Sequence, residues 1–195
     1  MKANDDDAAL ASRIAQGDRD ALSHVYQRES GRVYRYALAM THNADMAADA
    51  TQETFMSFSA NPRGFDATRG ALQGYLVGIT RHWVLSAWQA DKRFVDAAPE
   101  DLTELEESQI DERDPSALLV AQQSSEQLMQ ALAKLPATFR EAIILVELQD
   151  YSYADAAALA GIELNTLRTR LFRAKHKLAA ILGSERQHAE ERRAA

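Results

Sequence analysis

A helix-turn-helix pattern with a basic second helix runs from Ser152 to Lys177. Ser152 can cap the first helix, with Asp155 three residues later as its partner in a capping box. Gly161 stands where a tight turn between two helices needs a residue that tolerates a positive φ. Beyond it, apolar residues recur at steps of three and four, which predicts one buried stripe on the second helix. The members of this stripe are Leu164, Leu167, Leu171, Ala174 and Leu178.

The opposite face of the second helix carries side chains that suit DNA. It combines hydrogen-bonding groups, cations and an aromatic ring that can meet a thymine methyl. An ordinary amphipathic helix with a solvated basic face is the alternative, since such faces are common. The residues of this outward face are Asn165, Thr166, Arg168, Thr169, Phe172, Arg173 and His176.

The charge of this helix contrasts with that of the whole chain, whose formal net charge is −7. An acidic protein is repelled by a polyanion, so a local group of cations indicates a docking surface rather than general adhesion. The cations concerned are Arg168, Arg170, Arg173, Lys175 and Lys177.

Acidic residues crowd between Asp96 and Asp114, where Pro99 interrupts the chain and no apolar period is sustained. Such a segment is typical of a linker extended by self-repulsion. The apolar period returns after Ser116, and the charged residues beyond Gly183 are expected to fray. The sequence therefore predicts an N-terminal helical domain (1–94), an acidic linker (95–116), a C-terminal domain with the helix-turn-helix (117–183) and a charged tail (184–195).

Strand signals are nearly absent, because β-branched residues are sparse and Ala, Leu, Arg, Glu and Gln fill the periodic segments. We therefore expect an all-α protein of two small helical domains. The predicted helices are Asp6–Gln16, Arg19–Thr41, Ala44–Ala60, Leu72–Phe94, Ala117–Lys134, Pro136–Leu148, Tyr153–Ala160 and Leu164–Leu182.

One helix of the N-terminal domain has a polar, acidic outer face. An inward stripe of Met46, Ala50, Thr54 and Phe58 leaves an exposed methionine beside acids, which suits docking on another protein. A solvated helix surface is the alternative, and the spacing alone favours it. The exposed residues are Asp49, Gln52, Glu53 and Met56.

The segment 64–70 is a turn-rich loop that leads into a helix where aromatic residues and cations alternate. Such a combination suits single-stranded bases, which are bound by stacking and phosphate contacts. For any single aromatic residue here, packing in the core is the more common role.

Enzyme chemistry finds little support in the sequence. There is no cysteine, which removes disulfides and thiolate zinc sites and suits a reducing cytoplasm. The five histidines are scattered, and neither a Gly-rich phosphate loop nor a nucleophile elbow occurs. Asp5, Asp6 and Asp7 are expected to be solvated. We expect no catalytic activity, metal, cofactor or membrane insertion.

Two motifs in this order resemble an extracytoplasmic-function (ECF) sigma factor of bacterial RNA polymerase. The first is Asp49-Ala50-Thr51-Gln52-Glu53-Thr54-Phe55. The second runs from Ser152-Tyr153 to Arg173-Ala174, preceded by Leu135-Pro136. The resemblance covers the chain from about Leu10 to Leu182.

The resemblance implies a function for each segment. Asp49, Gln52 and Glu53, with Phe55 as support and Met56 beside them, would dock on the clamp helices of the polymerase β′ subunit. The loop and helix after it would bind a flipped base of the minus-10 promoter element, and the helix-turn-helix would bind the minus-35 element in the major groove. The residues implied at the minus-10 element are Phe65, Asp66, Tyr75 and His82.

The resemblance also implies partners. These are core RNA polymerase, through the β′ clamp helices and the β flap, promoter DNA, and an anti-sigma factor that would cover exposed apolar side chains. His82 and Tyr75 depart from the family, which usually has Asn and Trp there, and so point to a different promoter sequence. A stand-alone dimeric helix-turn-helix regulator of duplex operator DNA is the alternative function, but it leaves the segment from Asp49 to Phe55 unexplained.

Overall fold

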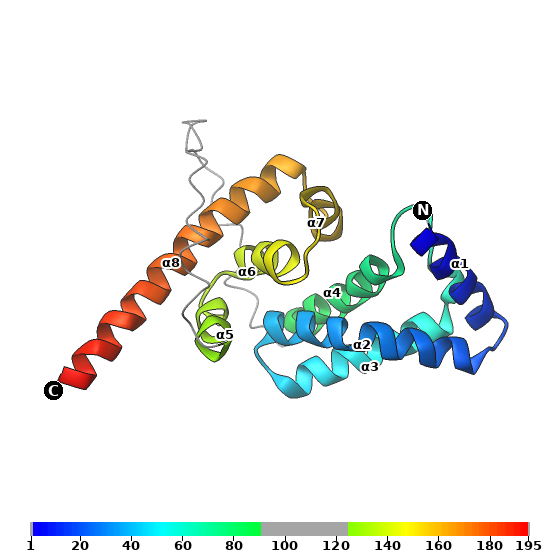
Figure 1. Ribbon diagram of the computed structural model, residues 1–195, viewed down its shortest axis with the longest axis horizontal. Coiled ribbons are helices and arrows are strands. Elements are labelled where there is room, and N and C mark those ends of the chain that lie inside the picture. The colour runs from blue at the N-terminus through cyan, green and yellow to red at the C-terminus, as the bar shows by residue number, and fades with distance from the viewer. Residues whose placement is uncertain (1, 91–124, 195) are drawn as a thin grey trace. The chain divides into compact units, whose positions relative to one another are not determined.

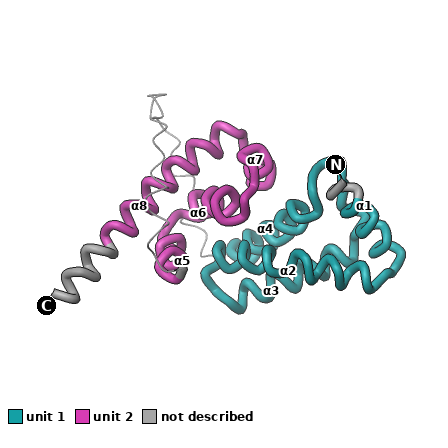
Figure 2. The backbone as a smooth tube through the Cα atoms, in the orientation of Figure 1, with its two compact units in different colours: residues 1–91 teal, residues 92–195 magenta. Residues whose placement is uncertain are grey.

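The computed structural model describes residues 2–90 and 125–194, and their side chains except those of 2–5, 90, 125 and 185–194. The chain divides into two compact units, residues 1–91 and residues 92–195 (Figure 2). Within the described ranges the secondary structure consists of helices and turns, without a β-strand. The prediction of an all-α protein is thereby confirmed for this part of the chain.

The N-terminal unit contains four α-helices: α1 (Lys2–Ala15), α2 (Arg19–Thr41), α3 (Ala44–Ala60) and α4 (Leu72–Ala90), with a 3₁₀ turn, η1 (Pro62–Gly64), after α3. Helix α2 packs against α1, α3 and α4, and α1 also contacts η1 (Figure 1). A shared apolar core holds the helices together, because each contributes one buried face to it. Its members include Leu10, Ile14, Val25, Val33, Phe58, Leu72 and Leu76.

Local signals decide where α2 and α3 begin. The Asp18 carboxylate accepts hydrogen bonds from the backbone amides of Asp20 and Ala21, both at 3.0 Å. The side chain of Asn43 accepts from the amide of Met46 at 3.0 Å. These caps satisfy amides that have no partner within the helix, so both helices begin where the sequence predicts.

The C-terminal unit contains α5 (Ser125–Ala133), α6 (Ala137–Ile143), a π-helical turn η4 (Ile144–Leu148), α7 (Tyr153–Ala160) and α8 (Leu164–Ala194). The half-buried guanidinium of Arg140 in α6 donates to the carbonyls of Leu132, Ala133 and Leu135, at 2.9, 2.7 and 3.0 Å. Burial lowers the pKa of this guanidinium. Leu132 and Ala133 are the last two residues of α5, and Leu135 lies in the turn that follows, so the three bonds fix the turn between α5 and α6.

Within the described ranges, the structure differs from the sequence-based boundaries by more than one residue in three helices. Helix α1 begins at Lys2, and the helix expected over 136–148 is α-helical only to Ile143, after which it continues as η4. Helix α8 continues to Ala194 instead of ending at Leu182 with a frayed tail. No proline follows Gly183, and the Glu, Arg and Ala residues beyond it are strong helix formers, so one glycine does not end the helix.

Some predictions concern residues outside the described ranges. These are the acidic linker 95–116, the first part of the helix expected from Ala117, and the end of the helix expected to reach Phe94. The expected functions of the domains also stay predictions. Among the helices of residues 2–90 and 125–194, none combines the length and apolar character needed to span a bilayer.

Candidate nucleic-acid interface

The helix-turn-helix is built by the residues that the sequence singles out. Ser152 Oγ accepts from the Asp155 amide at 3.1 Å, so the predicted serine cap forms. The Asp155 carboxylate accepts from the Ser152 hydroxyl at 2.7 Å, whereas the return bond of a capping box comes from the backbone amide of the capping residue. Gly161 has a φ of 68° and a ψ of 37°, a left-handed conformation that ends α7. Together the cap and the turn set the angle at which α8 leaves α7.

The buried stripe of α8 begins later than the sequence predicts. Leu167, Leu171 and Ala174 are buried, and Leu178 is half-buried. Leu164 was expected in the stripe, but its side chain is 36% exposed. As the first residue of α8, it has neighbours from its own helix on one side only, so it is less covered than residues one turn further along.

The outward face of α8 presents the predicted set of side chains. Thr169 Oγ1 donates to the Asn165 carbonyl at 3.0 Å, which leaves the hydroxyl oxygen as an acceptor. The rings of Phe172 and His176 meet edge to face with centroids 4.4 Å apart, and Phe172 is 39% exposed. Asn165, Arg168, Phe172 and His176 are exposed, whereas Thr166, Thr169 and Arg173 are half-buried.

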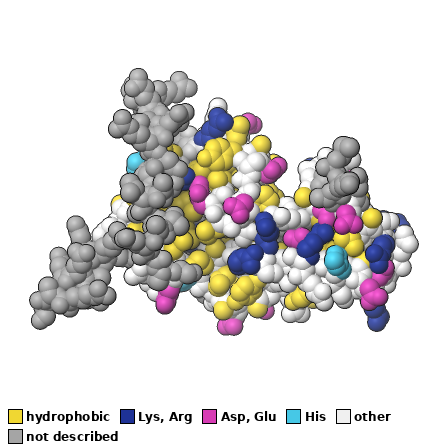
Figure 3. Space-filling view, in the orientation of Figure 1, with side chains coloured by type: hydrophobic (Ala, Val, Ile, Leu, Met, Phe, Trp, Pro, Cys, Tyr) yellow, Lys and Arg dark blue, Asp and Glu magenta, His cyan; other side chains and the backbone are white. Residues whose placement is uncertain are grey.

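The cations of α8 do not all belong to this outward face. Lys175 Nζ lies 3.0 Å from Glu147 Oε1 of the π-helical turn, and its side chain is only 16% exposed. Lys175 therefore joins α8 to η4, whereas Arg168 and Lys177 are exposed. On the face of the molecule drawn in Figure 3, basic side chains stand among acidic and apolar ones without forming one continuous basic surface.

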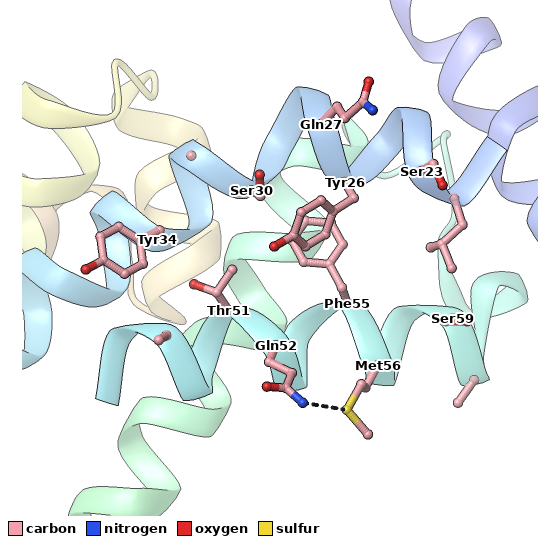
Figure 4. A pocket seen from close by; sticks show the side chains of 14 residues that line it. Ser23, Tyr26, Gln27, Ser30, Tyr34, Thr51, Gln52, Phe55, Met56 and Ser59 are labelled. Carbon is pink, nitrogen blue, oxygen red and sulfur yellow. Dashed lines mark hydrogen bonds between the residues drawn. The ribbon is translucent and has the colours of Figure 1, made fainter. Parts of the chain in front are cut away.

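In the N-terminal unit, the four predicted residues of α3 are all exposed: Asp49, Gln52, Glu53 and Met56. Met56 is 56% exposed, and Gln52 Nε2 lies 3.8 Å from its sulfur (Figure 4). The inward face consists of Ala47, Ala50, Thr51, Thr54, Phe55 and Phe58, and Met46 is half-buried.

A groove between α2 and α3 adjoins this exposed face. Gln52 and Met56 line it from α3, together with the buried Phe55. From α2, the 48%-exposed Tyr26 lays its ring against Phe55, with centroids 4.8 Å apart (Figure 4). The contribution of α2 is not predicted from the sequence, although Tyr26 directly follows the apolar Val25, and adjacent positions of a helix point to different sides.

The loop between α3 and α4 brings together two of the four residues expected at the minus-10 element. The half-buried rings of Phe65 and Tyr75 are 5.6 Å apart. Asp66 is exposed and accepts from the hydroxyl and the amide of Thr68, at 2.7 and 2.9 Å. These hydrogen bonds lower the pKa of Asp66. His82 is also exposed, but it lies about 10 Å further along α4 than Tyr75, two turns away.

Gly64 allows the tyrosine to approach the loop closely. A Cβ atom at this position would lie 2.7 Å from the Tyr75 hydroxyl and 2.9 Å from Asn61 Nδ2. Any other residue would therefore displace Tyr75 or the loop.

Two family models match the chain, one in each unit. Sigma-70 region 2 matches residues 25–94, and Sigma-70 region 4 matches residues 125–178. The ECF RNA polymerase sigma factor SigC of Mycobacterium tuberculosis is 34% identical over 185 residues, which are 91% of this chain and 93% of the relative. The ECF sigma factor EcfG of Rhodopseudomonas palustris is 34% identical over 147 residues, 75% of this chain and 77% of the relative. The chain belongs to the ECF RNA polymerase sigma factor family.

A solved structure agrees with this assignment. The sigma factor RpoE from Bartonella quintana, in complex with the anti-sigma factor NepR, is 27% identical with a TM-score of 0.62, covering 83% of this chain and 96% of that one. CnrH, in complex with the cytosolic domain of CnrY, shares the fold at a TM-score of 0.66 and 21% identity, covering 91% of this chain and 97% of that one.

This ECF sigma factor is thus a promoter-specificity factor of RNA polymerase, from a family of non-catalytic initiation factors. Sigma factors bind core RNA polymerase and promoter DNA. The alternative of a stand-alone dimeric regulator is not favoured, because it does not account for the sigma region 2 match over residues 25–94.

Proposed function

We propose that this sigma factor docks on the β′ clamp helices of core polymerase through the exposed residues of α3 and the adjoining groove. Asp49 and Glu53 supply charge, Gln52 supplies hydrogen bonds, and Met56 supplies an adaptable apolar contact. The observation that carries this proposal is that all four side chains are exposed beside an apolar groove with Tyr26 on its other wall. An exposed methionine and an aromatic residue at one groove are typical of a protein interface.

The α3–α4 loop and the first turns of α4 bind the minus-10 element as a single strand. Phe65 and Tyr75 supply aromatic surface, and the exposed Asp66 and His82 supply hydrogen-bonding groups. Capture of an unstacked base here stabilises the melted promoter. The pairing of the two rings supports this assignment, and we assign His82, two turns further along α4, to a neighbouring nucleotide.

The outward face of α8 reads the minus-35 element in the major groove. Asn165, Arg168 and Arg173 supply hydrogen bonds, while Phe172 supplies an apolar contact. Thr166, Thr169 and His176 complete the face. The same C-terminal unit contacts the β flap of the polymerase, so that both promoter elements are read only in the holoenzyme.

The protein acts in the cytoplasm, where RNA polymerase works, and it has no catalytic activity of its own. An anti-sigma factor covers its exposed apolar side chains until a signal releases it. Tyr26, Met56 and Phe172 are exposed in this chain and supply such surface. Co-purification from the native cell tests this partner, and recovery of the sigma factor without any such protein would count against it.

Run-off transcription with purified core polymerase on a library of genomic promoters tests the main proposal. We expect initiation that depends on both the core enzyme and the sigma factor. Initiation without the sigma factor, or operator binding without the core enzyme, would contradict it.

A matched pair of variants tests the docking surface. Glu53→Gln removes a charge beside the groove, whereas Asp20→Asn removes one from an exposed position outside the groove lining. We expect Glu53→Gln to weaken core binding about 5- to 50-fold, as for truncation of an interface contact, and Asp20→Asn to leave it unchanged. Equal effects of the two variants would mean that only net charge matters.

A further inference from the structure

Asp7 of α1 is a buried carboxylate with two partners from distant segments. The sequence analysis expected it to be solvated, but it is 5% exposed. Its Oδ1 accepts from Arg28 Nη2 of α2 at 2.6 Å, and its Oδ2 accepts from the backbone amide of Leu72 at 2.9 Å. The prediction that Asp7 is solvated is wrong because its partner Leu72 is 65 positions away in sequence, and no local pattern predicts such a contact.

The Arg28 guanidinium compensates the buried charge of Asp7. It also donates to Glu29 at 2.7 Å. Partial burial lowers the pKa of Arg28, but the bonds to Asp7 and Glu29 outweigh that effect and raise it. The paired charges explain how a carboxylate is accommodated between three helices.

Leu72 is the first residue of α4, and its amide has no partner within the helix. A side chain at the preceding position usually accepts hydrogen bonds from the first turn, but that position is Ala71, whose methyl group cannot accept one. The Asp7 carboxylate supplies a missing acceptor from α1, and its negative charge also suits the positive end of the helix. Asp7 therefore caps the first residue of α4 from another helix.

The start of α4 is also the end of the loop that carries Phe65 and Asp66. At its other end this loop is held by η1, which packs on α1, and by the fit of Tyr75 over Gly64. Tyr75 lies one turn into α4 and contacts Phe65 across the loop. A change in the first turn of α4 would move Tyr75 relative to Phe65, and the contact from α1 is made to that first turn.

We propose that Asp7 is a positioning residue for minus-10 recognition: by capping α4 from α1, it holds Phe65 and Tyr75 in the arrangement that receives single-stranded DNA. The inference rests on the function proposed for these two residues. Asp7 itself lies inside the N-terminal unit, so its effect reaches DNA through the start of α4. Asp7, Arg28 and Leu72 are absent from the lining of the groove beside α3, so we expect core binding through α3 and minus-35 binding through α8 not to depend on Asp7.

Asp7→Asn tests this role in the reconstituted holoenzyme. The asparagine has one acceptor oxygen and one amide group, so it can satisfy either Arg28 or Leu72 but presents a donor to the other. The probe is a single-stranded oligonucleotide from the non-template strand of a promoter found by run-off transcription, with a scrambled oligonucleotide as baseline. We expect about fivefold weaker binding of the promoter oligonucleotide, as for one lost helix cap, with unchanged affinity for core polymerase.

Two further variants separate positioning from general stability. Asp6→Asn removes the same charge from the exposed neighbour of Asp7 and is expected to change nothing. Ala71→Ser in the Asp7→Asn background gives α4 a local cap, on the amide of Gln73 or Gly74 rather than that of Leu72, and is expected to restore part of the oligonucleotide binding. If Asp7→Asn weakens core and oligonucleotide binding alike, or if Ala71→Ser restores nothing, the role of Asp7 is structural only and the proposal fails.

Amide hydrogen exchange in the wild-type protein tests the contact without a variant, in case Asp7→Asn does not fold. Ala44 is the matched comparison, because it is the first residue of α3 and its cap, Asn43, accepts from Met46 instead. The Leu72 amide should exchange at least about tenfold more slowly than that of Ala44, because exchange follows local opening. Equal rates would contradict the proposal.

The outcomes also distinguish the inference from the function beneath it. If the wild-type holoenzyme binds promoter and scrambled oligonucleotides equally, minus-10 recognition by this loop fails. If the wild type discriminates and Asp7→Asn discriminates equally well, only the inference about Asp7 fails.

Discussion

Arg173 and Lys175 lie two positions apart on α8 but contact different surroundings. Lys175 forms an ion pair with Glu147 at 3.0 Å, while Arg173 belongs to the half-buried edge of the outward face. Sequence alone assigned both cations to one basic helix. Only the packing of η4 against this part of the chain separates a structural lysine from a residue available to DNA.

Arg173→Ala should reduce promoter binding at one position of the minus-35 element. A bidentate contact of the guanidinium with guanine contributes about 1–3 kcal/mol of base discrimination. The measurement compares holoenzyme binding to promoters with each base at each minus-35 position. Lys175→Ala, which removes the same charge from the same helix, should leave base preferences unchanged. Uniform weakening by Arg173→Ala would instead indicate a phosphate contact.

The carboxyl group of Asp66 should titrate below its ordinary pKa, because the hydroxyl and amide of Thr68 bond its charged form. The loop contact is therefore fully present above the ordinary carboxyl pKa and is lost as the pH falls through the lowered value. A nuclear magnetic resonance titration measures this pKa. Thr68→Val removes the hydroxyl and keeps the amide, so it should raise the pKa of Asp66 toward its ordinary value. An unchanged pKa would mean that the hydroxyl bond is absent in solution.

At the scale of elements, two glycines near α8 have opposite roles. Gly161 ends α7 at a positive φ of 68°, whereas Gly183 lies within α8 with nothing within 4 Å of the place its Cβ would occupy. The predicted helices end directly before each of these glycines, at Ala160 and Leu182. Only Gly161 ends a helix, because α8 continues through Gly183.

Gly161→Ala should lower the free energy of unfolding by about 1–2 kcal/mol, the cost of a side chain in the left-handed region. Gly183→Ala should raise it by about 0.5–1 kcal/mol, because alanine is the better helix former. Denaturant unfolding followed by circular dichroism measures both. A loss of stability in Gly183→Ala would show that α8 does not continue through this position in solution.

At the scale of the whole molecule, the negative net charge of the chain is consistent with its function as a sigma factor. With a net charge of −7 and Lys175 already paired, the isolated chain makes few contacts with phosphates. Weak DNA binding by the isolated chain suits a sigma factor, because a promoter-specificity factor reads DNA together with the polymerase.

The isolated protein should therefore bind a promoter duplex weakly, with a Kd no tighter than about 10⁻⁶ M at physiological salt, as for non-specific binding. Fluorescence anisotropy with a labelled promoter measures this, and addition of core polymerase should tighten binding by orders of magnitude. Tight, sequence-specific binding by the sigma factor alone would contradict the expectation. A duplex with a scrambled minus-35 element is the control.

The sequence by itself determined the features that depend on local chemistry. Helical periodicity placed α2, α3 and α7 at their observed boundaries, and the exposed side of α3 follows from the same wheel. The turn at Gly161 is local as well, because a short stretch of backbone and its capping side chains decide it. Together with the order of the two motifs, these local features were sufficient to recognise the family.

Only the tertiary structure decided which side chains meet across the fold. The caps from Asp7 and Arg140 join residues of different helices, and the groove beside α3 exists only because α2 contributes Tyr26. Such contacts depend on how helices pack, and the periodicity of one helix contains no information about its neighbour's register. For that reason the sequence predicted the exposed sides of α3 and α8. Only the fold determined that Asp7 and Arg140 are charged residues that join neighbouring helices.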